Sequence, residues 1–371
     1  MRAVIISHTY SDPAHRGKLQ ALVGQGAALA VAVPARWTPP GTSESVLTPF
    51  AEDNGVRIVP IPTSGLQNGG TPVSWRPGEI RRLLTDFRPA IVQVEEEPTT
   101  RVAASATRVA RQLGIPAVAF TADSLLRSYP LLPRLRRRRT LSRAAAILGT
   151  NAVATGIVRT EFPGLAWESI PQLGLPVPRA PATEPHAPLS IGFVGRLIPE
   201  KGLDVLLRAC VRLYGAWTLT VAGTGPAQEE LEALAERLGI ASRVTWLGGI
   251  PRSELASLWP RLDCLVAPSR TTARWVETYP LQVLEAMGHG VAVVVSDSGA
   301  LPESVGRAGL VFGDGHPDGL TEALTRLLED GSLRERLAAE GRRRVIAEFV
   351  DDAIARKTLA FWRAVREGGG S

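Results

Sequence analysis

Short apolar runs rich in β-branched residues alternate with helical patterns along most of the chain, and one proline-rich stretch interrupts the alternation. Strands alternating with helices are typical of parallel sheets that carry helices on both faces. The sequence therefore predicts an α/β fold with two Rossmann-like, doubly wound domains. We expect strands at 3–7, 29–34, 56–61, 90–95, 117–121 and 145–149, and then at 189–194, 217–222, 244–247, 264–267, 291–296 and 309–312.

The interruption lies between Pro171 and Pro188, where six prolines occur without any periodic pattern. We interpret 173–188 as a linker between an N-terminal domain of 1–172 and a C-terminal domain of 189–351. A chain of 371 residues also exceeds what one core usually holds. The end of the chain, 368–371, resembles a flexible tail.

Cysteine content and hydropathy limit the kinds of protein that this chain can be. Cys210 and Cys264 both lie in apolar runs, so we expect buried reduced thiols and neither a disulfide scaffold nor a metal cluster. No apolar run approaches the roughly 20 residues that span a bilayer, and the N-terminus lacks the pattern of a secretory signal. We therefore expect a cytoplasmic protein.

The net charge of +6 comes almost entirely from arginine, since the only lysines are Lys18, Lys201 and Lys357. A GC-rich genome is one explanation, because it favours arginine codons. The positive charge is concentrated between Arg134 and Arg143, beside Leu131, Leu132 and Leu135. Three interpretations stay open: a solvated helix face, a peripheral contact with the inner face of an anionic membrane, or a grip on a phosphorylated acceptor. We expect no nucleic-acid partner, because neither a helix-turn-helix nor a zinc spacing accompanies the cluster.

The first candidate motif is the turn GRLIPEKG, which follows the strand expected at 189–194. It begins at Gly195 and leads into a helix after Gly202, so backbone amides at the helix start favour an anion. Arg196 adds a planar guanidinium group that can donate two parallel hydrogen bonds, and Lys201 adds a compact ammonium charge. Both groups suit a diphosphate. A surface turn flanked by two cations is the alternative interpretation.

The second candidate motif carries Glu277 and Glu285, separated by the seven residues TYPLQVL. Glu277 precedes Pro280 and is expected in the loop before a helix. The loop that follows it, with Tyr279, Pro280 and Leu281, is expected to face a sugar and its phosphates through its backbone amides. Glu285 lies in an apolar stretch, where a carboxylate needs hydrogen-bond donors, and the hydroxyls of a ribose supply them. Two solvent-exposed glutamates are the alternative.

Two glycine-containing turns complete the set. Gly223 and Gly225 follow the strand expected at 217–222, and GALPE follows the strand expected at 291–296. A dinucleotide fingerprint requires a small residue three places after Gly225, where this chain has Gln228. The interpretation as an NAD-binding site is therefore poor.

In their order and spacing these motifs resemble glycosyltransferase family 4, whose members have the GT-B fold. The resemblance rests on FVGRLIPEKG, VAGTGP, VTWLGGI, VAPS, ETYPLQVLEAMGHG, VVVSDSGALPESV and GLVF. It implies that Arg196 and Lys201 bind the donor diphosphate, that Glu285 binds the ribose and that Glu277 contacts the transferred sugar. It also implies that the backbone near Gly249 and Ile250 meets the base. The final helix, about 352–367, would cross back to the N-terminal domain.

The resemblance fades in the N-terminal half. Many members carry two glycines where this chain has Arg16 and Gly17, and many carry a histidine where this chain has Ala122 and Asp123. Asp123 is a candidate replacement for that histidine. Glu96 and Glu97 end a strand and are candidates for contacting the acceptor, together with Arg16 and Gly17. In the second motif, proline replaces a frequent glycine at position 280.

The resemblance implies a retaining hexosyltransferase that uses a nucleotide diphosphate-sugar, UDP in preference to GDP, and an unidentified hydroxyl acceptor. Arg196, Lys201 and helix amides would stabilise the departing diphosphate, so Glu277, Arg196, Lys201 and Asp123 are the candidate catalytic residues. The chain contains no Asp-x-Asp pair, and we expect neither a metal nor a cofactor beyond the donor. The alternatives are a catalytically silent nucleotide-sugar or glycan-binding protein and a nucleotide-sugar epimerase. A phosphorylase is less consistent, because pyridoxal phosphate requires a lysine and only Lys201 falls in a candidate site.

Overall fold

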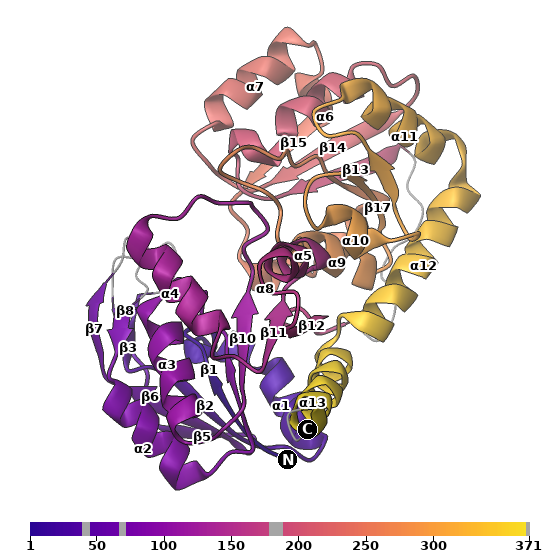
Figure 1. Cartoon of the computed structure of the whole chain (residues 1–371). Helices are drawn as coiled ribbons and strands as arrows, with labels where there is room; N and C mark the ends of the chain where they lie inside the picture. Colours follow the sequence, from indigo (N-terminus) through magenta and orange to yellow (C-terminus); the bar gives the residue numbers. More distant parts are fainter. Residues whose placement is uncertain (39–44, 67–71, 178–187, 369–371) are drawn as a thin grey trace. The chain divides into compact units, whose positions relative to one another are not determined.

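The computed structural model describes residues 1–38, 45–66, 72–177 and 188–368. These residues form two compact units (Figure 1). Unit 1 comprises Met1–Pro176 and Asp351–Ser371, and unit 2 comprises Val177–Val350. Most of the expected linker, and the tail beyond Gly368, lie outside the described residues.

In the described part of unit 1 the main sheet has eight strands, all paired in parallel except for an antiparallel edge at β5. The strand order is β12 (Ala166–Ser169), β11 (Ala146–Gly149), β10 (Ala117–Thr121), β9 (Ile91–Val94), β1 (Arg2–Ile6), β2 (Ala28–Pro34), β6 (Val56–Ile61) and β5 (Ala51–Asp53). The central strands are buried on both faces, which explains their continuous apolar sequences. Two short hairpins, not expected from the sequence, are β3 (Arg36–Trp37) with β4 (Val46–Leu47) and β7 (Thr63–Leu66) with β8 (Pro72–Trp75).

Helices cover both faces of this sheet. On one face α1 (Gly17–Gly24) and α13 (Asp351–Gly368) pack on alternate strand residues such as Ala3 and Ile5. On the other face α2 (Pro77–Phe87) and α3 (Arg101–Gln112) pack on Val4 and Ile6. The period of two along a strand thus divides the core into two layers. Two further helices are α4 (Leu131–Leu141) and α5 (Ala152–Glu161).

In the described part of unit 2 the sheet has six strands, and all of them pair in parallel. The strand order is β15 (Val244–Gly248), β14 (Trp217–Ala222), β13 (Leu189–Val194), β16 (Cys264–Ala267), β17 (Ala292–Ser296) and β18 (Leu310–Phe312). The helices are α6 (Leu203–Cys210), α7 (Gln228–Arg237), α8 (Arg252–Leu255), α9 (Leu281–Gly288), α10 (Leu301–Val305), α11 (Pro317–Glu329) and α12 (Gly331–Glu348).

The predicted fold class is confirmed, and most expected strands lie within one residue of their observed bounds. Cys210 and Cys264 are buried free thiols, as expected. The final helix expected at about 352–367 is observed as α13, and the chain breaks at Phe349–Val350 between α12 and α13. That break returns the chain to unit 1.

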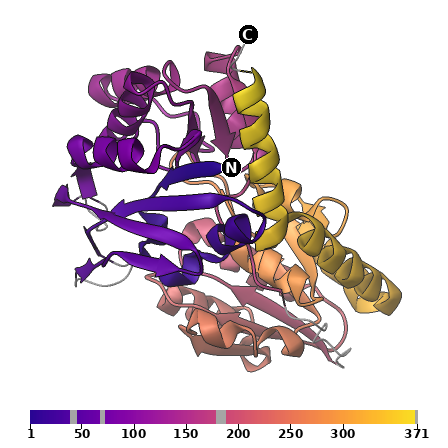
Figure 2. The same ribbon diagram turned by 90° about the horizontal axis from the view of Figure 1, so that it is seen from below.

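The last helix is part of the core of unit 1. Figure 2 shows α13, in yellow, beside the indigo α1. Trp362 on α13 is fully buried, and its Nε1 donates a hydrogen bond to Gln93 Oε1 on β9 at 2.6 Å. At the start of α13 the Asp351 carboxylate lies so close to Gly17 and Gly174 that a Cβ on either glycine would come within 2.3 Å of an Asp351 oxygen. Gly174 leaves no room for a side chain, because backbone atoms of Asp351 also lie within 2.6 Å of its Cβ position, whereas a side chain at position 17 would require the Asp351 carboxylate to move.

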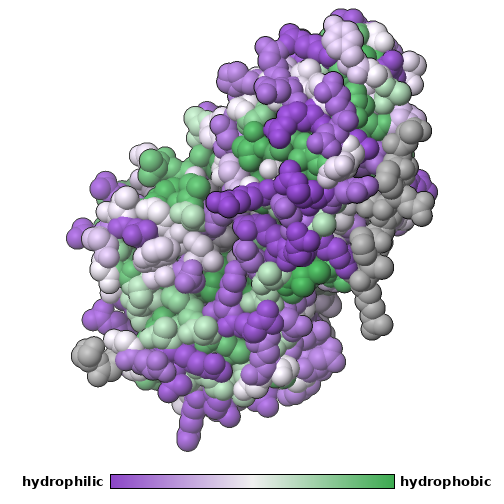
Figure 3. Space-filling view, turned by 90° about the vertical axis from the view of Figure 1, so that its right-hand side faces the viewer, coloured by the Kyte–Doolittle hydropathy of each residue, from purple (hydrophilic) through white to green (hydrophobic). Residues whose placement is uncertain are grey.

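On the face drawn in Figure 3, hydrophilic residues are interspersed with smaller hydrophobic areas. Within the described ranges, no helix combines the length and the apolar character needed to cross a membrane.

Replacing Trp362 by alanine should lower the free energy of unfolding by about 3–5 kcal/mol, because it removes a buried indole and leaves Gln93 Oε1 without its hydrogen-bond donor. Arg363→Ala on the exposed side of the same helix is the matched control and should change stability by less than about 0.5 kcal/mol. Urea unfolding of the full chain measures both. Equal effects of the two variants would contradict a core role for α13.

Candidate active site

Each sheet has one point at which the order of its strands reverses. In unit 2 the chain builds outward from β13 to β14 and β15, and then continues on the other side with β16 and β17. In unit 1 it does the same around β1, with β2 on one side and β9 on the other. In open parallel sheets ligands bind beyond the carboxyl ends of the strands at such a switch point. The candidate residues of the sequence follow these strand ends in both units.

In unit 2 the turn after β13 is shaped by glycines that allow backbones to touch. Gly223, with φ +147°, leaves no room for a side chain, since a Cβ there would lie 1.8 Å from the Gly195 carbonyl oxygen. A Cβ on Gly225 would lie 2.3 Å from the Leu197 carbonyl oxygen. The amide of Gly195 donates a hydrogen bond to the carbonyl oxygen of Ala222 at the end of β14, and the amide of Leu197 donates one to Thr224 in the loop that follows, so the two turns are held together. The glycine motifs of the sequence thus hold one turn directly against the other.

Lys201 and Glu277 form an ion pair that joins the two sides of the switch point. Lys201 Nζ lies 2.6 Å from Glu277 Oε2, and the same oxygen accepts a hydrogen bond from Ser269 Oγ at 3.0 Å. Both charged side chains are almost fully buried, with exposed fractions of 12% and 8%. Lys201 Nζ also lies 5.2 Å from the centre of the Trp275 ring. No hydrogen bond to Glu277 Oε1 is found among the described residues, so one oxygen of this carboxylate is available to a ligand.

Arg196 lies in the same turn and is exposed. Its guanidinium has no ion-pair or hydrogen-bond partner among the described residues. Because the charge of Lys201 is already balanced by Glu277, Arg196 supplies the uncompensated positive charge of this site. An anion entering the site would meet one free cation and one paired cation.

The loop between β16 and α9 carries the remaining residues of the second motif. Gly299, with φ +55°, packs so tightly that a Cβ would lie 2.2 Å from the Glu277 carbonyl oxygen, and this oxygen accepts a hydrogen bond from Ala300 N at 2.8 Å. Pro280 caps α9 instead of starting its first turn, and Leu281 is the first helical residue. Tyr279 and Glu285 are both partly exposed, so Glu285 is less buried than its apolar sequence context suggested.

The segment expected to face a base lies beside the glycine turns. Gly223 N donates a hydrogen bond to the Gly248 carbonyl oxygen at 2.7 Å. Gly249 is exposed and approaches Thr224, while Ile250 is partly exposed. The structure therefore gathers Gly195, Lys201, Gly223, Gly225 and Glu277 at one sheet edge, with Gly249 adjoining it.

His8 lies at the switch point of unit 1 and was not among the residues predicted from the sequence. This histidine directly follows β1, and both its backbone N and its Nδ1 lie 2.8 Å from Glu96 Oε1. Burial alone would lower the pKa of His8, but the negative charge of Glu96 and its hydrogen bond raise the pKa above its ordinary value. The position of His8 at the end of the first strand was the available signal.

Glu97 and Asp123 lie at the carboxyl ends of β9 and β10. Glu97 Oε1 accepts a hydrogen bond from Ala122 N at 2.6 Å, and its Oε2 accepts one from Thr121 Oγ1 at 2.9 Å. Burial outweighs these bonds and raises the pKa of Glu97 to about 7. Asp123 is held by Arg127 Nε at 2.9 Å and by the Tyr129 hydroxyl. Two carboxyl groups thus converge where many family 4 members carry a histidine.

Two residues predicted on the acceptor side have internal contacts. Arg16 is buried, and its guanidinium donates to the Tyr10 carbonyl oxygen at 3.0 Å and pairs with Asp53 at 2.9 Å. Gly17 accommodates the Asp351 carboxylate described above. Their roles toward an acceptor stay predictions. Within the described residues no cluster of three or more His, Cys, Asp or Glu side chains could hold a metal ion.

The arginine-rich segment between Arg134 and Arg143 forms most of α4 and is not uniform. Leu131 and Leu132 at its start are 71% and 68% exposed. Arg137 is buried, pairs with Glu161 and lies over the Tyr129 ring, so this arginine is structural. The other basic side chains of the helix extend toward solvent to varying degrees.

Each half of the chain matches a family model of glycosyltransferases. Residues 179–344 match the family of glycosyl transferases group 1, and residues 16–164 match a glycosyl transferase 4-like domain. A GDP-mannose-dependent α-(1-6)-phosphatidylinositol monomannoside mannosyltransferase from Mycobacterium tuberculosis is 34% identical over 178 residues. That match covers 46% of this chain and 46% of the relative. A glycogen synthase from the same organism is 31% identical over 56% of this chain and 50% of its own length. The chain thus aligns with about half the length of these relatives.

Solved structures resemble the whole chain. Sucrose-phosphate synthase from Thermosynechococcus elongatus has a TM-score of 0.71 at 18% identity and covers 99% of this chain and 100% of its own. Anabaena Alr3699/HepE in complex with UDP has a TM-score of 0.71 at 15% identity, with 98% and 100% covered. At such identities the likeness concerns the fold alone. The chain therefore has the GT-B fold of glycosyltransferases; unit 1 matches the model of the glycosyl transferase 4-like domain, and unit 2 matches that of glycosyl transferases group 1.

Proposed function

We propose that the chain is a retaining, metal-independent glycosyltransferase that moves a hexose from a nucleotide diphosphate-sugar to a hydroxyl acceptor. The observation that carries the proposal is the Lys201–Glu277 pair at the switch point of unit 2, with the unpaired Arg196 beside it. Cations that meet a carboxylate at this edge match the chemistry of a sugar joined to a diphosphate. The glycosyl transferases group 1 match over 179–344 covers all of these residues.

The diphosphate lies, in this proposal, between Arg196 and Lys201. Arg196 binds phosphate oxygens as a fork, and Lys201 contributes a point charge that Glu277 holds in place. Amides of the first turn of α6 point the same way as the helix dipole and add to the attraction. Gly223 and Gly225 hold the loop after β14 against the turn after β13, because a Cβ at either position would clash with the carbonyl oxygen of Gly195 or Leu197.

The sugar and the nucleoside occupy the two sides of that anion. Glu277 Oε1 accepts a hydrogen bond from a sugar hydroxyl, while Oε2 stays bound to Lys201 and Ser269. Glu285 on α9 accepts hydrogen bonds from the ribose, and the backbone at Gly249 and Ile250 contacts the base. We propose UDP as the nucleotide. The Anabaena structure in complex with UDP supports this choice, whereas the mannosyltransferase relative is named for GDP-mannose.

Transfer proceeds by attack of the acceptor on the face from which the diphosphate leaves. The acceptor oxygen forms a bond to the anomeric carbon, the bond from that carbon to the diphosphate oxygen breaks, and the acceptor proton moves to the departing phosphate. Arg196 and Lys201 stabilise the negative charge that grows on the leaving group, which replaces the role of a metal ion. His8, Glu96, Glu97 and Asp123 of unit 1 are the proposed contacts of the acceptor.

A catalytically silent nucleotide-sugar-binding protein is the second candidate. This candidate function is favoured by the contacts of Asp123, the residue at the position of the missing histidine. Its carboxylate is already bound by Arg127 and by the Tyr129 hydroxyl. An epimerase of this fold would need an acid and a base close to the sugar. Slow release of free nucleotide diphosphate from the donor in water distinguishes a transferase from a silent binder.

Lys201→Ala should raise the Kd for the nucleotide diphosphate by about 10- to 100-fold. The loss of one charge-assisted hydrogen bond costs about 1.5–3 kcal/mol, and the unpaired Glu277 then repels the ligand. Lys357→Ala, on the exposed face of α13, is the matched control and should leave the Kd unchanged. Isothermal titration calorimetry with UDP and with GDP measures the Kd of each variant and of wild type. An unchanged Kd in Lys201→Ala would contradict the diphosphate assignment.

Glu277→Gln should separate donor binding from transfer. The amide keeps an oxygen for Ser269 and Lys201 but removes the negative charge, so the affinity for nucleotide diphosphate should stay equal or increase. Turnover should fall about 100-fold, because the carboxylate no longer contacts the sugar. Steady-state kinetics and calorimetry on the same preparation test both statements. Unchanged turnover would refute the sugar contact, and a weaker nucleotide affinity would show that Glu277 mainly positions Lys201.

We also propose that α4 contacts an anionic membrane surface through its exposed leucines and arginines. Leu131→Ser with Leu132→Ser should reduce binding to vesicles that contain phosphatidylglycerol by about tenfold, because each leucine contributes buried apolar area. Leu47→Ser, at a leucine of β4 that is 64% exposed, is the control. Co-sedimentation measures the bound fraction, and equal binding of wild type to neutral phosphatidylcholine vesicles would contradict the proposal.

A further inference from the structure

Unit 1 contains a hollow at the end of its sheet opposite to His8, Glu96 and Asp123. It has a volume of about 460 Å³ and lies before β9, β10 and β11, at Ala90, Pro116 and Ala145. These strands enter the sheet here, whereas the candidate acceptor residues follow their carboxyl ends. The hollow is therefore separate from the candidate active site of unit 1.

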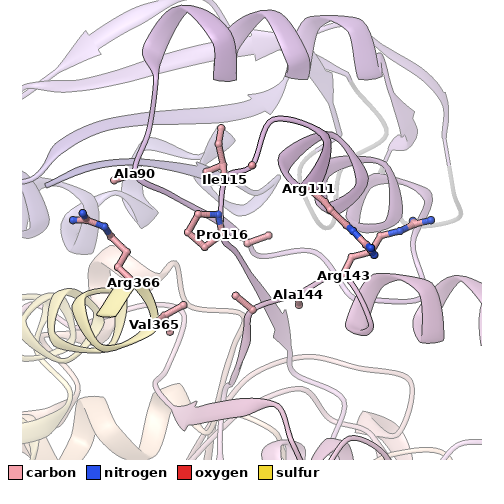
Figure 4. A pocket seen from close by; sticks show the side chains of 11 residues that line it. Ala90, Arg111, Ile115, Pro116, Arg143, Ala144, Val365 and Arg366 are labelled. Carbon is pink, nitrogen blue, oxygen red and sulfur yellow. The ribbon is translucent and has the colours of Figure 1, made fainter. Parts of the chain in front are cut away.

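The charged side chains that line this hollow are all arginines: Arg111, Arg143 and Arg366. Figure 4 shows the ends of Arg111 and Arg143 in the same region on one side of the hollow, whereas Arg366 extends along the other side near Ala90. Arg111 comes from the last turn of α3, Arg143 follows α4 and Arg366 belongs to α13. Three elements that are distant in the sequence thus contribute arginines to the lining of one cavity, and two of the guanidinium groups lie in the same region.

None of these guanidinium groups has an ion-pair or hydrogen-bond partner among the residues that the structure describes. Burial lowers the pKa of Arg143, and the positive charges of Arg108, Arg111 and Arg139 lower it further. The charges acting on Arg143 are therefore repulsive. The C-terminal ends of α3 and α4 favour a nearby cation, but they provide no hydrogen-bond acceptors for the N–H groups of these guanidinium groups.

The rest of the lining is small or apolar. Ala90, Gly114, Ala117, Ala144 and Ala145 have little side chain, so the floor of the hollow is open. Ile115, Pro116 and Val365 form an apolar wall. An inorganic anion alone would leave this wall uncovered. The arginines and the apolar wall together fit a small organic molecule that carries a dianionic group. The volume of the hollow is usual for ligands of this size.

We propose that this hollow is a second binding site, which takes a phosphate monoester through Arg111 and Arg143. Two planar forks suit the oxygens of one phosphate, and its two negative charges remove the repulsion between the arginines. Arg366 adds a third cation from α13. The bound ligand therefore joins the ends of α3 and α4 to the C-terminal helix and stabilises unit 1.

Calorimetry with glycerol 3-phosphate and with inorganic phosphate tests the site on the full chain. Lys201→Ala serves as the background, so that phosphate binding at the candidate donor site is weakened. In this background we expect Arg111→Gln with Arg143→Gln to raise the Kd for glycerol 3-phosphate at least tenfold, and Arg111→Lys to have a smaller effect. Arg82→Gln is the control, because Arg82 is an exposed arginine of unit 1 whose charge is paired with Asp86. Equal affinities in the double variant and in the Arg82→Gln control would overturn the proposal.

A vesicle measurement identifies the source of the phosphate. Binding of glycerol 3-phosphate without lipid, lost in the double variant, indicates a soluble ester. Binding only to vesicles with phosphatidic acid, and also lost in the double variant, indicates a lipid headgroup in the same site. Vesicle binding that survives in the double variant and disappears with Leu131→Ser and Leu132→Ser, without any binding of soluble phosphate, would overturn the site. Thermal unfolding should agree, since a ligand of the folded state raises the unfolding temperature only where its site is intact.

Discussion

The ion pair between Lys201 and Glu277 is the interaction on which the organisation of unit 2 toward a ligand depends. The two residues are far apart in the sequence, and they meet because β16 pairs with β13 at the point where the strand order reverses. An almost buried charge is costly unless it is paired, so each residue fixes the other. The pair keeps a cation and a carboxylate at one sheet edge, and the exposed Arg196 adds the charge that remains unbalanced.

Close packing of backbone against backbone shapes the sheet edge at which Lys201 and Glu277 lie. Gly223 and Gly225 let the turn after β14 lie against the turn after β13, and Gly299 does the same for the loop that carries Glu277. Any side chain at these positions would push the turns apart and displace Lys201 from Glu277. Glycine also allows a close approach in unit 1, where Asp351 at the start of α13 packs against Gly17 and Gly174. Glycine thus fixes both the candidate donor site and the attachment of α13.

The alternation of apolar runs and helices was sufficient to predict the buried strands of both sheets, because buried parallel strands need continuous apolar sequence. It did not predict the edge strands β5 and β12 of unit 1, which are short and partly exposed. Lys201 and Glu277 were each identified from their motifs, but their contact depends on the order of the strands, which no local pattern contains. Arg16 shows a second limit of prediction from sequence. Nothing in its sequence context distinguishes a guanidinium that faces an acceptor from one that binds backbone carbonyl groups. His8 was missed because a lone histidine after a strand is uninformative until Glu96 is found beside it. The arginine hollow likewise unites α3, α4 and α13, which only the folded chain brings together.

Thermal unfolding of the full chain with nucleotide sugars tests the central claim most directly, because a ligand stabilises only the state that binds it. UDP-, GDP- and ADP-hexoses are compared in the presence of a chelator, for wild type and for Lys201→Ala. The account predicts a higher unfolding temperature of wild type with a UDP-hexose, and a much smaller increase in the variant. If no nucleotide sugar raises the unfolding temperature of wild type, or if the variant responds equally, the donor site at the switch point of unit 2 is contradicted.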